Sequence, residues 1–420
     1  EQLTVYLSTQ APHMMQHLFA KHLGIEEHLV RVICRDVGGS FGIKVHSYAD
    51  EYATVTLAYM LKRPVKFIAD RLESFTTDIH ARDHRVKIRM AVSNEGEIQA
   101  TEIDDLTGIG PYSVYPRTSG MEANQIVNLT ASQYTCPNYR AKATVVFQNK
   151  TPMCQYRAVG HPVLCLITEG IVDTAADTIG MDPVEFRKKN LVPDDAYPWT
   201  TPVGIPYELL SHHASLDKIL EMMDYDALRA DQAKWRNSAV YRGIGFATFV
   251  EVTNPGPAFY GVGGAPISAQ DGATMRLDAK GNIIIGTGVT EQGQGAEAVV
   301  FQCAATALGV SMDKIRVITG DTDITPYGGG TWGSRAAGIG GEAAVQAGKA
   351  LRANILKLAG VMLQSDSATL DIRENNVVDA SDGRERISLA EVGRVAYYRP
   401  DTLPKDFQSE LVVTRHYVPK

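Results

Sequence analysis

The sequence predicts a mixed α+β protein made of two modules, each with its own helices and strands. Apolar and polar residues alternate on both sides of Asn94-Glu95-Gly96, which is the pattern of a β-hairpin. Residues 296–308 are rich in alanine and are instead typical of a helix. A stretch rich in proline, aspartate and aromatic residues, 191–206, separates the two parts of the chain. We therefore expect two mixed α/β modules, over residues 1–198 and 199–420.

Strands, glycine loops and helices alternate along the first module. Its strands are expected at residues 5–8, 30–34, 65–69 and 143–147, and its helices at 11–23, 46–60 and 164–179. The second module is expected to hold a polar helix at 216–235, a strand at 243–252, a hairpin of 273–277 and 282–286, the helix 296–308, a strand at 315–319 and a helix at 338–359.

Composition and charge exclude several classes of function. Of the 420 residues, 44% are hydrophobic and 21% are charged, and the net charge is −7, so no basic stripe for nucleic acid is present. No apolar run reaches the roughly 18 residues that span a bilayer. The five cysteines are scattered and include no Cys-x-x-Cys, which argues against an iron–sulfur cluster or a structural zinc in this chain. We expect a cytoplasmic protein.

The most informative stretch is residues 286–309, a glycine loop that leads from an apolar strand into a helix. The loop contains Gly288, Gly293 and Gly295. Such a loop offers main-chain N–H groups and the positive end of a helix dipole. The side-chain amides of Gln292 and Gln294 add donors and acceptors. The pattern suits a large polar ligand that bears phosphates and a heterocycle, although the glycines alone are equally compatible with a tight strand-to-helix turn.

Two further glycine-rich loops follow strands, at residues 36–42 and 327–337. The first does not match the G-x-G-x-x-G spacing of a dinucleotide-binding fold, which argues against that fold. The second brings a hydroxyl and a guanidinium, Ser334 and Arg335, to the start of a helix, as in anion-binding sites. A loose segment at 254–266 is of the kind that lines a site. Three polar loops in one chain are explained economically by one ligand held from several sides.

Arg157 lies in a loop bounded by glycine and proline, after Tyr156 and before a long apolar helix. Its guanidinium is always charged and can bind carboxylate, carbonyl or oxo groups. The alternative interpretation is that Arg157 binds carbonyl groups of its own loop.

Together these motifs resemble those of the large, molybdenum-binding subunit of the molybdenum hydroxylases, the family of xanthine dehydrogenase, aldehyde oxidase and aerobic carbon monoxide dehydrogenase. The resemblance extends along essentially the whole chain. The matching motifs are Ser8-Thr9-Gln10, Gly38-Gly39-Ser40-Phe41-Gly42-Ile43-Lys44, Tyr156-Arg157, Arg187-Lys188-Lys189-Asn190, Gln292-Gly293-Gln294-Gly295 and Thr331-Trp332-Gly333-Ser334-Arg335.

The resemblance implies a molybdenum-binding pterin cofactor, in the form of molybdopterin cytosine dinucleotide, lying between the two modules. No side chain of the protein is expected to bind the metal directly. Arg157 is implied to be catalytic, beside the metal on the substrate side. The residues implied to contact the cofactor are Gln10, Gly39, Ser40, Phe41, Gly42, Arg157, Arg187, Gln292, Gly293, Gln294, Gly295, Gly333, Ser334 and Arg335.

The chemistry implied is hydroxylation of an electron-poor carbon with oxygen from water. Electrons are expected to leave through 2Fe-2S clusters and FAD on partner subunits. The family's general-base glutamate lies in a glycine-rich motif that this chain lacks, so we expect it on a separate part of the molybdenum subunit. The chain alone is therefore expected not to turn over.

Two positions bear on the substrate. In the family, carbon monoxide dehydrogenases carry a cysteine after Tyr-Arg, where this chain has Ala158, and the purine-oxidising enzymes carry a glutamate where it has Val45. An N-heteroaromatic compound or an aldehyde is thus favoured. The alternative from another class is a scaffold subunit without cofactor.

Overall fold

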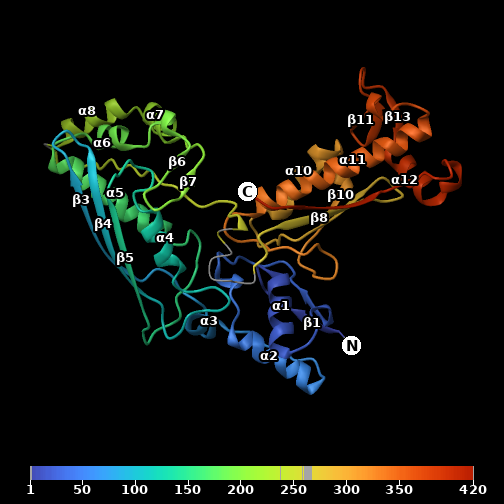
Figure 1. The fold of residues 1–420 in the computed structure, drawn as a ribbon, viewed down its shortest axis with the longest axis horizontal. Coiled ribbons are helices and arrows are strands. Elements are labelled where there is room, and N and C mark those ends of the chain that lie inside the picture. Colours follow the sequence, from blue (N-terminus) through green and yellow to red (C-terminus); the bar gives the residue numbers. More distant parts are fainter. Residues whose placement is uncertain (1, 237, 258, 260–266, 420) are drawn as a thin grey trace. The chain divides into compact units, whose positions relative to one another are not determined.

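The computed structural model describes residues 2–236, 238–257, 259 and 267–419, which form two compact units (Figure 1). Unit 1 comprises Glu1–Asp70 and Val252–Lys420, and unit 2 comprises Arg71–Glu251. Both units contain helices and strands, which confirms the predicted α+β class. The sequence predicts a different division, into two consecutive modules that meet between residues 198 and 199, and this division stays a prediction.

Unit 1 contains two strand–helix–strand motifs with parallel strands. In the first, α1 (Pro12–Leu23) connects β1 (Leu3–Tyr6) to β2 (Val30–Ile33). In the second, α10 (Ala296–Leu308) connects β9 (Ile283–Thr287) to β10 (Ile315–Ile318). Parallel strands joined through a helix present their carboxyl ends at the same edge, where the loops that follow them meet.

The two motifs are copies of one local design. Residues 23–33 and 308–318 share Leu-Gly at the start and Arg-Val-Ile at the end, at the same spacing. In each copy the glycine ends the helix in the left-handed region, with φ of 66° at Gly24 and 81° at Gly309, and a short 3₁₀ helix precedes the strand. The copies are joined where the N–H of Cys34 donates to the carbonyl of Gly320 (2.6 Å).

The rest of unit 1 extends the second motif. Its sheet has the order β10-β9-β8-β14, with β8 (Asp271–Leu277) and β14 (Val412–Tyr417) antiparallel to each other. The long helix α11 (Gly341–Leu363) runs beside α10 and packs on this sheet (Figure 1). Unit 1 also contains α2 (Ala49–Leu61), β11 (Leu370–Arg373), β12 (Asn376–Asp379), β13 (Glu385–Ser388) and α12 (Leu389–Tyr398).

Unit 2 is built on a three-stranded sheet. The predicted hairpin is present as β3 (His84–Val92) and β4 (Ile98–Gly108), and β5 (Tyr139–Val146) pairs with β4 in parallel. Helices α4 (Met121–Leu129) and α5 (His161–Thr178) pack on this sheet and on each other. The remaining elements are α3 (Arg71–Thr77), α6 (Pro183–Asn190), β6 (Trp199–Thr200), β7 (Pro206–Tyr207), α7 (His212–Met223) and α8 (Tyr225–Trp235).

Three predicted elements differ in the structure. The strands predicted at 65–69 and 243–252 are irregular backbone. In the second case the carbonyls of Phe246 and Thr248 accept from the side chains of Arg187 and Gln133, which takes acceptors that a sheet ladder would use. The predicted helix 216–235 is two helices, because Asp224 adopts a φ of 50° between α7 and α8.

Of the predicted loose segment 254–266, residues 258 and 260–266 lie outside the described residues. Among the helices that the structure describes, none is long and apolar enough to cross a bilayer.

Candidate functional site

Most of the predicted site residues follow the carboxyl ends of the four strands that form the two strand–helix–strand motifs of unit 1. Gln10 follows β1, and residues 39–42 follow β2. Residues 292–295 follow β9, and 333–335 follow β10. This is the edge at which open α/β sheets bind ligands. Arg157 and Arg187 belong to unit 2.

Two buried glutamines connect these loops. The Gln10 side chain donates to the carbonyl of Thr331 (2.8 Å) and accepts from the N–H of Gly42 (3.0 Å). Gln292 accepts from the hydroxyl of Ser40 (2.5 Å), and its carbonyl accepts from the N–H of Gly39 (3.1 Å). Each amide thus ties together loops that are separated by hundreds of residues in the chain, which fixes their relative positions.

Thr290 and Thr331 complete the network. The hydroxyl of Thr290 donates to the carbonyl of Gln10 (3.0 Å), and the hydroxyl of Thr331 donates to the carbonyl of Thr290 (2.9 Å). Both threonines are buried. Sequence reasoning did not single out either hydroxyl, although Thr290 stands just before the Gln-Gly repeat and Thr331 begins the Thr-Trp-Gly-Ser-Arg motif.

The tips of the three loops are exposed, in contrast to their bases. Phe41 is 54% exposed in a left-handed conformation (φ 53°), and Ser334 is exposed with a φ of 55°. At Gly293, whose φ is 92°, no atom lies within 4 Å of the position that a Cβ would take. Hydrogen-bonded bases with exposed tips, one of which has no side chain, form a surface that a large polar group can approach closely.

The N-terminus of α10 is already occupied by a carboxylate of the chain itself. Glu291 accepts from the N–H groups of Gln292, Gly293 and Gly295 (2.8 to 3.1 Å), and its second oxygen accepts from Glu297 (3.0 Å). Partial burial raises the pKa of Glu291, but these four N–H groups outweigh it and lower the pKa below its usual value. The N–H groups of this loop, which the sequence predicts to be available for a ligand, therefore already donate to Glu291. A phosphate here would meet a negative charge.

Arg335 is buried and binds the chain's own acceptors. Its guanidinium donates to the carbonyls of Ser268 and Gln270 (both 2.7 Å) and forms an ion pair with Asp271 (3.3 Å). It is 0% exposed, so this geometry favours a role in fixing the third loop over the predicted contact with a ligand.

Arg187 is likewise 0% exposed. It donates to Glu169 (2.9 Å) and Asp173 (2.8 Å) and to the carbonyls of Pro183 and Phe246 (both 3.0 Å). These contacts use four of the five N–H donors of the guanidinium. The geometry therefore favours a structural role over the predicted contact with a cofactor.

Arg157 differs from both, because it is exposed at the tip of its loop. The following residues turn sharply, with φ of 61° at Ala158 and 71° at Gly160, and α5 begins at His161. The carbonyl of Arg157 accepts from the guanidinium of Arg82. The loop thus carries a permanent positive charge, and its main chain is fixed by Arg82.

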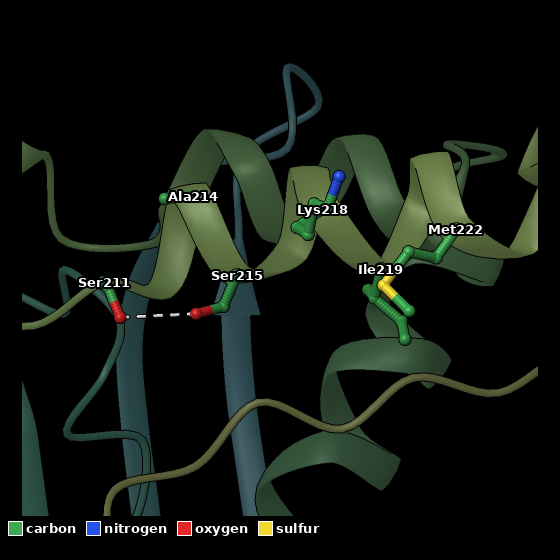
Figure 2. Close-up of a pocket in the computed structure, with 6 residues that line it drawn as sticks. All are labelled: Ser211, Ala214, Ser215, Lys218, Ile219 and Met222. Atoms are coloured by element: carbon green, nitrogen blue, oxygen red, sulfur yellow. Dashed lines mark hydrogen bonds between the residues drawn. The ribbon is translucent and has the colours of Figure 1, made fainter.

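A separate cavity of about 390 Å³ lies on α7 (Figure 2) and contains none of the predicted site residues. Figure 2 shows Ser211 and Ser215 facing each other one turn apart, with their hydroxyls 3.3 Å from each other. Lys218 pairs with Glu221 (2.8 Å). The cavity offers no pairing of a nucleophile with a base, and we do not assign it to the site.

Comparison with known proteins places this geometry in a family. The model of the molybdopterin cofactor-binding domain matches residues 1–191, and a second model of the same description matches residues 218–419. The chain belongs to the molybdopterin cofactor-binding family. The first matched segment contains Gln10, and the second contains Gln292 and Thr331, which belong to the same hydrogen-bond network.

Two relatives of this chain are large subunits. It is 31% identical to the carbon monoxide dehydrogenase large chain of Hydrogenophaga pseudoflava, covering 99% of this chain and 52% of the relative. It is also 31% identical to the nicotine 6-hydroxylase large subunit of Paenarthrobacter nicotinovorans, covering 99% and 51%. The chain thus spans about half the length of the curated relatives it matches.

The solved structure of quinoline 2-oxidoreductase from Pseudomonas putida 86 matches with a TM-score of 0.91 and 32% identity, over 100% of this chain and 53% of that one. The exposed loop tips leave room for a large polar group such as molybdopterin, because no atom lies within 4 Å of the place where a Cβ of Gly293 would stand, and the glutamine network holds the loops in place. The first turn of α10 does not fit a phosphate, because Glu291 fills it.

Proposed function

We propose that this chain holds the molybdenum cofactor of a molybdenum hydroxylase, which oxidises an N-heteroaromatic compound or an aldehyde with oxygen from water. We further propose that the cofactor is molybdopterin cytosine dinucleotide. The observation that carries the proposal is the buried network of Gln10 and Gln292, which fixes three polar loops at one edge of the paired motifs.

The loops 39–42, 292–295 and 333–334, which are exposed at Phe41, Gly293 and Ser334, would hold the cofactor. When bound, it supplies the metal centre at which water oxygen is transferred and two electrons are accepted. The contribution of this chain is to bind and orient it through preset donors and acceptors. Arg157 would place a fixed positive charge next to substrate oxygen or nitrogen, and Gln10 would act by holding the second loop.

Partner chains are part of the proposal. The part of the chain that the structure describes has no group of three His, Cys, Asp or Glu side chains placed to hold a metal. We propose that an iron–sulfur subunit and an FAD subunit carry the electrons away. We also propose that the general-base glutamate lies on a further part of the molybdenum subunit, because the relatives are about twice as long.

Two relatives support the N-heteroaromatic class by their names. Nicotine and quinoline both contain an aromatic nitrogen ring, and the proteins named for them are 31% and 32% identical to this chain. The carbon monoxide dehydrogenase large chain is equally similar, at 31%. Ala158 supports the N-heteroaromatic or aldehyde class, because a methyl group cannot bind a metal as a cysteine thiolate does.

The proposal is tested on the complex purified with and without the substitution Gln292→Ala. We expect wild-type protein to contain molybdenum and to release CMP on acid hydrolysis, and the variant to lose tenfold or more of both, because two loops lose their shared anchor. The matched control is Gln346→Ala, which removes a partly buried glutamine that bonds to Glu342 within α11 (3.1 Å).

Wild-type complex without molybdenum would contradict the proposal and favour the scaffold alternative. Equal losses in both glutamine variants would show that the network has no particular part in holding the cofactor.

A further inference from the structure

A buried cluster of charged side chains lies behind the Arg157 loop in unit 2. Its centre is His84 on β3, whose two ring nitrogens both contact carboxylates. Nδ1 lies 3.1 Å from Asp105 on β4, and Nε2 lies 3.1 Å from Glu122 on α4. The hydroxyl of Thr107 donates to Asp105 (2.6 Å) and lies 2.9 Å from Nδ1. Two ring nitrogens facing two carboxylates fit an imidazolium, which donates from both.

Glu122 connects this cluster to the loop. One of its oxygens contacts His84, and the other accepts from the N–H of Gly160 (3.2 Å), the last residue before α5. The same oxygen lies 3.7 Å from Nε of Arg82. Glu122 is 4% exposed, so these interactions are poorly screened by water. The carboxylate therefore links β3, α4 and the end of the Arg157 loop.

Arg82 reaches the loop from the other side. Its guanidinium donates to the carbonyl of Arg157 and lies over the ring of Tyr156, 5.6 Å from the ring centre. The backbone at Arg82 has a φ of 133°, a conformation that residues with a side chain rarely adopt. Such strain persists where the surroundings fix the residue.

The close approach of Gly160 to α4 completes the anchor. A Cβ at Gly160 would lie 2.8 Å from the carbonyl oxygen of Glu122 and 3.2 Å from Cβ of Gln125. The end of the loop thus packs against the first turn of α4, and the Glu122 side chain there accepts a hydrogen bond from it. Both ends of the tight turn that bears Arg157 are fixed by residues that sequence reasoning did not identify.

We propose that Glu122 and Arg82 are positioning residues, which fix the main chain of the Arg157 loop. This inference rests on the proposed function for its importance to turnover, but not for the order of the loop. Because the carbonyl of Arg157 is held, the main chain of the loop does not have to be ordered again when substrate binds. Neither residue is expected to touch substrate or cofactor.

The test measures hydrogen–deuterium exchange of residues 153–161 in the purified complex. We compare Glu122→Gln and Arg82→Gln with wild type. Loss of a charge-assisted hydrogen bond is expected to speed exchange of these amides by about tenfold or more. Arg82→Lys keeps a cationic donor and is expected to restore most of the protection. Because Glu122 is buried and its replacement can prevent folding, Arg82→Gln, at a partly exposed site, gives the decisive comparison.

The matched control is Glu102→Gln on β4, a carboxylate that pairs with Arg89 and Arg140 on the same sheet. It is expected to leave exchange of residues 153–161 unchanged. In the loaded complex, Arg82→Gln is expected to lower kcat/KM with unaltered molybdenum content.

Unchanged exchange in Arg82→Gln, or equal exchange in Arg82→Lys and Arg82→Gln, would overturn the proposal. Equal loosening in Glu102→Gln would show a general effect on the sheet and would also overturn it. A complex that lacks molybdenum but shows the expected exchange pattern would contradict the proposed function and leave the positioning of the loop intact.

Discussion

Glu291 determines what the glycine loop before α10 can bind. Gly293 and Gly295 have the open geometry of an anion cradle, but their N–H groups donate to Glu291 at 2.8 and 3.1 Å. The sequence shows the glycines and the helix start, and from these a phosphate site was a reasonable prediction. It does not show which way a neighbouring carboxylate turns, because that depends on local backbone geometry.

His84 gives a pH dependence at the residue scale. Burial lowers its pKa, but hydrogen bonds to Asp105 and Glu122 outweigh burial and raise the pKa to about 9. Because the folded-state pKa lies above the ordinary value near 6.5, the stabilisation is fully present below about pH 6.5 and is lost as the pH rises through 9. We expect the free energy of unfolding to fall by roughly 3 kcal/mol over this window.

Urea unfolding at pH 6.5 and pH 9.5 checks this expectation. His84→Gln is expected to remove most of the difference between the two pH values. His17→Gln is the control, because His17 pairs with Glu27 at a half-exposed site and should leave the difference in place. A wild-type protein equally stable at both pH values would contradict the assignment of charge to His84.

At the scale of elements, the two strand–helix–strand motifs explain why part of the site could be predicted from the sequence. The helix predicted at 296–308 has the bounds seen in the structure, because Gly295 and Gly309 end it by local geometry. The strands predicted at 65–69 and 243–252 are wrong, because strand formation requires a distant partner that local patterns do not reveal. The repeat of Leu-Gly and Arg-Val-Ile was visible in the sequence and would have related Gln10 to the Gln292 loop.

The repeat provides a matched pair of substitutions. Gly24 and Gly309 end equivalent helices in the left-handed region. A Cβ at Gly24 meets no atom within 4 Å, whereas at Gly309 it would lie 2.0 Å from the carbonyl oxygen of Ile372. We expect Gly24→Ala to cost about 1 kcal/mol of unfolding free energy from backbone strain alone. Gly309→Ala is expected to cost clearly more, about 3 kcal/mol, from strain plus overpacking. Urea unfolding of both variants checks the order, and equal costs would contradict the contact with Ile372.

At the scale of the whole molecule, unit 1 is assembled from both ends of the described chain. The N–H of Thr322 donates to the carbonyl of Val32 (3.1 Å), and Arg31 binds Asp321 through two hydrogen bonds (2.6 and 2.9 Å). These contacts align the two motifs so that their loops share the glutamine network. Composition and motif order indicated a multi-loop site, but this pairing spans about 290 residues and lies beyond local sequence reasoning.

We propose that the loops after four strands of unit 1 hold one molybdopterin. Diffraction data collected at the molybdenum absorption edge, on crystals of the loaded complex, test it most directly. We expect one metal peak, with cofactor atoms in hydrogen-bond distance of residues 39–42, 292–295 and 333–334 together. A metal peak whose cofactor leaves these three loops untouched would contradict the account.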